Sequence, residues 1–360
     1  MRWLPVAGFV DPSLRWRTGA MRATSESQRR AFQDGDLPPL EMVRPGVFAV
    51  ALAMPYPQIP FSYSYLIEGG SGDIHIVDTG LETDANWRAL VAAVDEMGYS
   101  IAAVASVMLT HVHADHSGLA ARIRAETGAT VGMHIADLRA MQENRTLIDG
   151  ASILALLVEW SVPPEYREEI RLAAAWPVAE GQDFIVDRVL TGGEVLQVGD
   201  RALRVLQTPG HTAGHLALVE DEAGLVFTGD HLLPVTNPGI GLGSRSAGDD
   251  PVGDYLASLA AVAALGDYEA CPGHEFRFSG LAERCAQVET HHRERAEQVA
   301  LLLDASPHRS VWEIASRLEW TQGWENLRGP RVMSALAQTA MHVDRVRRST
   351  CIEGSCQVTD

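Results

Sequence analysis

One short stretch of the chain places three histidines and an aspartate in the order His-x-His-x-Asp-His. These residues are His111, His113, Asp115 and His116, and they directly follow the apolar run 104–109. A buried strand that ends in so many polar groups must give them partners, because desolvating an unpaired polar group costs several kcal/mol. Neutral imidazole and carboxylate are ligands that suit zinc, with iron, manganese or nickel as substitutes. The stretch therefore predicts a metal site.

The spacing within this stretch predicts ligands that approach from two directions. Side chains of an extended segment alternate between its faces, so His111 and His113 point to the same side. Asp115 and His116 follow at the turn into a helix that begins near Ser117. One loop can therefore supply two neighbouring metal positions. Surface or helix-capping roles are the alternative, and they suit isolated histidines better than this cluster.

Three segments downstream each combine a short apolar run, a glycine turn and one metal-capable residue. The first is Thr-Pro-Gly-His-Thr with His211, the second is Thr-Gly-Asp with Asp230, and the third is Pro-Gly-His with His274. If these turns converge with the first stretch at one edge of stacked sheets, they complete a site. His215 and His231 lie next to two of these turns, and we assign them supporting or structural roles.

The four motifs in this order resemble the metallo-β-lactamase-fold hydrolases, over roughly residues 47–278. The resemblance implies an α/β fold of the four-layer αββα sandwich type. It also implies two zinc ions per chain, with iron or manganese possible. One metal would be held by His111, His113 and His211, the second by Asp115, His116 and His274, and Asp230 would bridge the two.

Asp78 matches a family position whose carboxylate orients a ligand histidine from outside the metal shell. Such a role makes physical sense, because a ligating imidazole needs an acceptor for its second N–H. A simple turn role before Gly80 explains Asp78 about as well when the residue is taken alone. No ligand of the family pattern is missing, which argues against a non-catalytic relative.

Composition limits the partners that the protein could have. The chain has 360 residues, 46% of them hydrophobic and 21% charged, and a net charge of −18, which disfavours nucleic acid and anionic membrane surfaces as partners. Four cysteines in a chain of this length do not indicate a disulfide scaffold. The N-terminus lacks a long apolar run, and no later segment reaches the roughly 20 apolar residues of a membrane span. We expect a cytoplasmic protein.

The pattern of elements divides the chain into four parts. Residues 1–45 lack periodicity and are expected to form a partly ordered N-terminal extension, which could pack on a second subunit of a homodimer. Residues 46–278 form the catalytic domain, with a three-helix insertion at 135–177 and a strand at 184–186. Residues 279–360 form a C-terminal helical module that is similar to the winged-helix-like module of some family members, although the acidic composition argues against DNA binding.

Two segments are candidates for contact with the substrate. The first is the proline-rich loop 54–61, which borders the active site in the family, and the second is the helical insertion, which lies over the metal site in relatives. Simple packing is an equally good explanation for the loop residues, and core packing is common for apolar residues at helical spacing. The candidate contacts are Tyr56, Ile59, Phe61, Trp160, Tyr166 and Trp176.

The chemistry expected of this site is hydrolysis of a small acyl substrate. A hydroxide that bridges two metals would attack a carbonyl carbon, and Asp115 and Asp230 are the candidate catalytic carboxylates. The first hypothesis is a hydrolase of a carboxylic ester, thioester or lactone, similar to glyoxalase II and lactonase relatives. A mononuclear iron oxygenase of the persulfide dioxygenase type, a metal-dependent ribonuclease and a non-enzymatic binding module are the alternatives. The identity of the bound metal separates the hydrolase from the iron oxygenase. A ribonuclease needs a basic groove to bind RNA.

Overall fold

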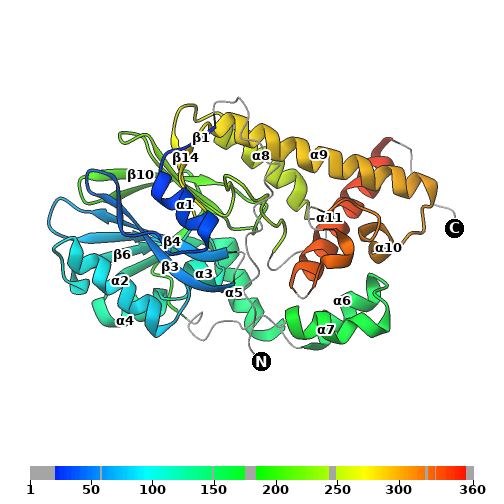
Figure 1. Cartoon of the computed structure of the whole chain (residues 1–360), viewed down its shortest axis with the longest axis horizontal. Coiled ribbons are helices and arrows are strands. Elements are labelled where there is room, and N and C mark those ends of the chain that lie inside the picture. The colour runs from blue at the N-terminus through cyan, green and yellow to red at the C-terminus, as the bar shows by residue number, and fades with distance from the viewer. Residues whose placement is uncertain are drawn as a thin grey trace.

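Two seven-stranded β-sheets form the centre of the computed structural model, which describes residues 21–56, 59–147, 150–174, 184–242, 249–320, 323–328 and 330–353 (Figure 1). The first sheet contains, in spatial order, β2 (Glu41–Arg44), β3 (Val47–Tyr56), β4 (Ile59–Glu68), β5 (Ile74–Val77), β6 (Val104–Met108), β7 (Thr130–His134) and β8 (Arg188–Leu190). The second contains β1 (Arg22–Ala23), β14 (Phe278–Ser279), β13 (Glu269–Pro272), β12 (Leu225–Gly229), β11 (Leu216–Glu220), β10 (Arg201–Gln207) and β9 (Val195–Val198).

Helices cover the outer face of each sheet, so the predicted αββα sandwich is confirmed. Helices α2 (Asp84–Glu96) and α4 (Ala120–Thr127) bury their apolar faces against the first sheet. Helices α8 (Pro251–Ala263) and α9 (Leu281–Ala305) do the same on the second sheet. A third apolar layer lies between the two sheets. Burial of alternate side chains on both faces explains the near-continuous apolar strands.

Strand direction explains why the polar turns meet at one place. Strands β5, β6, β7 and β8 are mutually parallel, so their carboxyl ends lie at the same edge of the first sheet. In the second sheet β12 and β13 are parallel, and β10 runs in the same direction because both it and β12 are antiparallel to β11. The loops after β5, β6, β10, β12 and β13 carry the residues that the motifs single out.

The described part of the N-terminal region belongs to the sandwich, so the predicted boundary at residue 45 and the arm-like extension are corrected. Strand β1 pairs with β14 at one edge of the second sheet, and β2 pairs with β3 at the edge of the first. Between them lies α1 (Glu26–Asp34), whose Ser25 cap accepts a hydrogen bond from Gln28 N. Edge strands of two and four residues carry too little periodicity to be predicted. Residues 1–20 lie outside the described range.

The insertion contains three helices as expected, namely α5 (Ile135–Leu147), α6 (Gly150–Glu159) and α7 (Pro164–Ala174). The strand expected at 184–186 is wrong, because the pairing of β7 with β8 begins only at Arg188. Phe184 instead packs into the apolar layer outside the first sheet. The short helix η1 (Ile101–Ala103) precedes β6, and the short helix α3 (Ala114–Ser117) contains the last two residues of the first metal motif.

The C-terminal region is helical in its described part, with α10 (Val311–Ala315), η2 (Trp324–Asn326) and α11 (Pro330–Glu353) following α9. In the described residues no strand follows β14, so the structure shows no wing for the expected winged-helix-like module. Residues of α6 and α7 share one apolar cluster with α10 and α11.

The described helices include none that is long and apolar enough to span a membrane.

A buried ion-pair network fastens the N-terminal segment to the second sheet. The guanidinium of Arg277, which is 3% exposed, pairs with Glu269 of β13 and with Glu41 of β2. Arg44 pairs with the other oxygen of Glu269 at 2.7 Å, and the Thr24 hydroxyl donates to Glu269 at 2.6 Å. The network thus connects the edges of both sheets.

Replacing Arg277 with Met should lower the free energy of unfolding by about 3 kcal/mol, because it leaves buried carboxylates without their cation. Urea denaturation measures the change. The matched control is Arg293→Met, since Arg293 forms an exposed pair with Glu289 on α9 and such pairs contribute less than about 1 kcal/mol. Equal unfolding midpoints for the two variants would contradict this account of the network.

Candidate metal centre

Three histidine nitrogens lie within 4.8 Å of one another at the edge where the strands end. His113 Nδ1 is 2.9 Å from His111 Nε2 and 3.0 Å from His211 Nε2. The first two residues follow β6, and the third follows β10. The sequence-predicted first ligand set is therefore assembled, and we call it the three-histidine cluster.

A second cluster lies beside it and consists of Asp115, His116 and His274. His274 Nε2 is 3.3 Å from Asp115 Oδ2, and His116 Nε2 is 3.9 Å from the same oxygen. Asp230 connects the two clusters. Its Oδ1 is 3.3 Å from both His116 Nε2 and His274 Nε2, whereas its Oδ2 is 3.6 Å from His211 Nε2.

These contacts fit a pair of metal ions. Nitrogen ligands of a tetrahedral zinc ion lie about 3.3 Å apart for Zn–N bonds of about 2.05 Å, close to the separations observed here. Among the described residues, neither His116 Nε2 nor Asp230 Oδ1 finds a well-oriented hydrogen-bond partner, although both atoms are buried and lie 3.3 Å from each other. Each ligand imidazole has an inner nitrogen, which faces the cluster, and an outer nitrogen, which faces the surrounding protein. When the outer nitrogen carries the proton, the inner nitrogens point lone pairs at one another, and these repel unless a cation lies between them. The donor set of imidazoles and carboxylates suits zinc, iron or manganese.

Each ligand histidine has an acceptor for its outer N–H. His116 Nδ1 donates to Asp78 Oδ2 at 2.8 Å, which gives Asp78 the orienting position that the family resemblance implies. His111 Nδ1 lies 3.1 Å from the Thr110 hydroxyl, which itself donates to Asp78 at 2.7 Å. Backbone carbonyls serve the remaining three rings: Leu242 for His113 (3.1 Å), Gly239 for His211 (2.6 Å) and Phe61 for His274 (2.9 Å). Such contacts fix tautomer and ring direction before metal binds.

Asp137 joins the first motif to the loop of His211, and the sequence did not single it out. Its carboxylate accepts from the backbone N–H of Val112 (2.9 Å) and of Gly214 (2.8 Å), and from the Thr212 hydroxyl (2.9 Å). The side chain is 1% exposed. Its position at the start of a helix gave no sign of a link to a loop 77 residues away.

His215 and Gly273 lie next to the ligand residues and contact them. His215 accepts from the backbone N–H of Asp230 at 3.1 Å while its Nδ1 lies 2.7 Å from the Thr208 hydroxyl, so it holds the bridging residue in place. Gly273 allows close packing, since a Cβ there would lie 2.5 Å from the His116 ring and 2.8 Å from Asp230 Oδ1. Any larger residue at Gly273 would push the two clusters apart.

The two clusters hold protons differently in the metal-free protein. Burial lowers the pKa of His111, and it lowers that of His211 to about 4, with neighbouring imidazoles contributing. Burial also opposes protonation of His274, but Asp230 and Asp115 outweigh it and raise its pKa to about 10. The pKa of His116 is raised in the same way by its three carboxylate neighbours.

Of the six candidate substrate contacts, the structure leaves some exposed near the metal centre and buries others in the core. Ile59 is exposed and Tyr56 half-buried at the β3–β4 turn, where both remain candidates. Phe61 is corrected, because its side chain is fully buried between the sheets and only its carbonyl reaches the site. Trp160 is also corrected, since it packs in the cluster shared with α10 and α11, and Tyr166 stacks on Trp312 at 5.2 Å. Trp176 lies outside the described residues.

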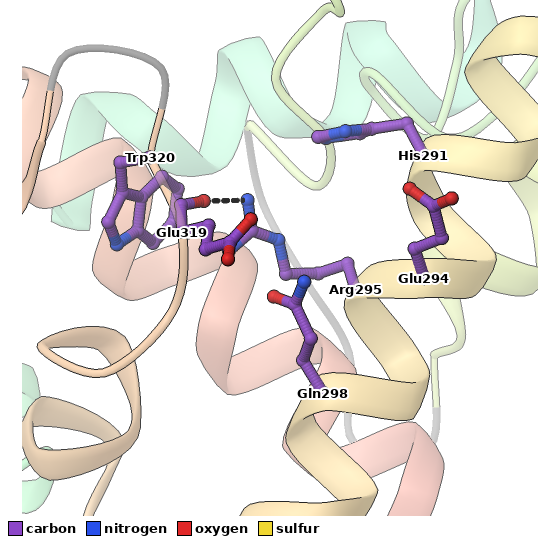
Figure 2. Close-up of a pocket in the computed structure, with 6 residues that line it drawn as sticks. All are labelled: His291, Glu294, Arg295, Gln298, Glu319 and Trp320. Carbon is purple, nitrogen blue, oxygen red and sulfur yellow. Dashed lines mark hydrogen bonds between the residues drawn. The ribbon is translucent and has the colours of Figure 1, made fainter.

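A separate pocket of about 270 Å³ lies between α9 and the segment after α10 (Figure 2). The Arg295 guanidinium donates to the Glu319 carbonyl at 2.7 Å and lies over the Trp320 ring at 4.4 Å. None of the residues that line it belongs to the metal clusters, so the pocket is distinct from the metal centre. The lining residues are His291, Glu294, Arg295, Gln298, Glu319 and Trp320.

An αββα sandwich with a divided His/Asp cluster at one sheet edge defines a metallo-hydrolase type of protein. Residues 59–274 match the metallo-beta-lactamase superfamily, to which the chain therefore belongs. A metallo-beta-lactamase family protein of Thermus thermophilus superposes with a TM-score of 0.70 at 30% identity, over 86% of this chain and 96% of that one.

Curated relatives agree with this family assignment. The probable metallo-hydrolase YqjP of Bacillus subtilis is 25% identical over 288 residues, which are 78% of this chain and 86% of the relative. A hydroxyacylglutathione hydrolase of Cereibacter sphaeroides is 26% identical over 225 residues, or 62% of this chain and 66% of the relative. The family binds metal ions, which agrees with the geometry of the two clusters.

Metal binding to the cluster of Asp115, His116 and His274 should release roughly two protons near neutral pH, because its histidines must become neutral to act as ligands. The three-histidine cluster should release few, since His111 and His211 are already neutral there. Affinity at the former cluster should therefore rise with pH. Calorimetric titration in buffers of different ionisation enthalpy counts the protons. Release of almost no protons when both positions fill with metal would contradict the predicted difference in protonation between the two clusters.

Proposed function

We propose that this protein is a dinuclear zinc hydrolase that cleaves a carboxylic ester, thioester or lactone of a small acyl substrate. The observation that carries the proposal is the complete set of seven donors, divided into two clusters that Asp230 joins. The name of the hydroxyacylglutathione hydrolase describes hydrolysis of an acylated thiol, which supports an acyl substrate here.

When bound, two such cations lower the pKa of a shared water and polarise a carbonyl oxygen. The chain's own residues handle protons around that chemistry. Asp115 is the more exposed of the two carboxylates, with 20% of its side chain accessible against 13% for Asp230. We assign Asp115 to orient the attacking water and to pass its proton to the leaving group, and Asp230 to hold the two clusters in register.

Tyr56 lies near this centre. Burial raises its pKa, and the nearby Asp115 carboxylate raises it further, so the phenol stays protonated near neutral pH. A protonated phenol can donate a hydrogen bond to a carbonyl oxygen of the substrate. We therefore retain Tyr56 as the leading substrate contact, with Ile59 at the same turn offering apolar surface.

The charges around the ligands favour a neutral carbonyl substrate over a phosphodiester. In the described part of the chain, the ion pairs of the seven ligands involve only histidines and aspartates. A phosphodiester site would use arginine or lysine to neutralise the phosphate. The assignment of a ribonuclease activity has no such support.

The purified protein should contain about two zinc ions per chain and hydrolyse at least one member of a panel of thioesters, lactones and aryl esters, but not a phosphodiester. Asp230→Ala should lower kcat by more than about 100-fold, since loss of even an outer partner costs 10–100-fold. Arg293→Met serves as the control with unchanged turnover. One iron per chain with no hydrolysis of the panel would overturn the proposal in favour of an oxygenase.

A further inference from the structure

The 233–242 loop supplies backbone carbonyls to two of the ligand histidines. Gly239 O accepts from His211 Nδ1 at 2.6 Å, and Leu242 O accepts from His113 Nε2 at 3.1 Å. Leu242 N also donates to the His211 carbonyl at 2.8 Å. The direction of two rings in the three-histidine cluster therefore depends on where this loop lies.

Arg284, in the first turn of α9, holds the first half of the loop. The side chain is 5% exposed, and its guanidinium donates to loop oxygens rather than to a carboxylate. The Arg284 guanidinium thus fixes the backbone of the loop. Its planar set of N–H donors does this better than the ammonium group of a lysine would. The acceptors in the loop are the carbonyls of Leu233 (2.7 Å), Val235 (3.2 Å) and Thr236 (2.9 Å) and the side-chain oxygen of Asn237 (2.9 Å), and a longer bond of 3.4 Å reaches Gln287 Oε1 on α9.

Glu275 binds the backbone N–H groups of the same loop segment. Its carboxylate accepts from Val235 N at 2.6 Å and from Thr236 N at 2.9 Å, and the residue is 3% exposed. It adopts φ +71°, a conformation that costs a non-glycine residue about 1 kcal/mol or more. Arg284 and Glu275 thereby satisfy the donors and the acceptors of two consecutive loop residues.

The far end of the loop lies against the C-terminal helix. A Cβ at Gly241 would lie 2.3 Å from the sulfur of Met341, which shows how closely α11 approaches the loop. Arg345 of the same helix pairs with Asp250, the residue that caps α8. Helix α11 thus limits movement of the loop away from the metal centre.

We infer that Arg284 and Glu275 are positioning residues that hold the 233–242 loop and so set the geometry of the three-histidine cluster. The inference rests on the two-metal site of the proposed hydrolase and adds residues that the sequence motifs do not contain. Both residues act through the loop carbonyls on His211 and His113. Loss of Arg284, which lies outside both ligand motifs, should therefore weaken the three-histidine position and spare the other.

Zinc affinity, measured by competition with a chromophoric chelator, tests this inference without any activity assay. Arg284→Met is made in a His274→Ala background, which isolates the three-histidine cluster, and in a His211→Ala background, which isolates the other. We expect a 10–100-fold loss in the first background, the range for outer partners of metal ligands, and less than about 3-fold in the second. Arg284→Lys should rescue part of the loss.

Arg293→Met, on the same helix but exposed, is the matched control and should change neither affinity. Circular dichroism and thermal melting establish that each variant is folded, and Arg284→Lys, with a smaller but equally selective loss expected, replaces Arg284→Met if the latter does not fold. Equal losses at both positions would show a general structural role and overturn the inference, as would unchanged affinity at the three-histidine cluster. Metal binding that follows the inference without hydrolysis of any ester would instead count against the proposed function alone.

Discussion

The structure depends on holding five imidazoles and three carboxylates together at one sheet edge, where they are largely buried. Buried polar groups are stable only when paired, and each outer nitrogen of the five rings has an acceptor from the protein. The inner atoms then have only one another to face. In the metal-free protein, the raised pKa values of His116 and His274 let protons balance the neighbouring carboxylates. A bound cation would replace these protons at a site whose geometry is already set, which is the physical meaning of a preorganised metal centre.

The sandwich makes this arrangement possible because it brings the ends of like-directed strands together. Five of the seven candidate ligands lie in loops after strands, and Asp115 and His116 lie in the short helix α3 that follows the loop after β6. Apolar layers on both faces keep the strands fixed. Three of the five rings use backbone carbonyls rather than side chains as acceptors. The positions of whole loops are thus as important as the identities of the ligands.

Most of the fold, and the seven residues that the structure brings together in the two clusters, could be predicted from sequence, because these residues occur in short motifs that follow apolar strands. Asp137 and Arg284 could not, since their partners lie 77 and about 50 residues away and no local pattern connects them. Phe61 and Trp160 were misjudged because an apolar residue near a site has the same pattern whether it faces a substrate or the core. The edge strands β1 and β2 are too short for periodicity to be recognised.

The apolar cluster shared by α6, α7, α10 and α11 makes the insertion and the C-terminal helices one unit, although they are far apart in sequence. Trp160, Leu157 and Ile170 of the insertion are buried only because that partner is present. Divergence of either segment must be matched by the other. Exchange of the insertion alone between relatives, in order to alter specificity, would transplant half of a core. The two segments should therefore be engineered as a pair.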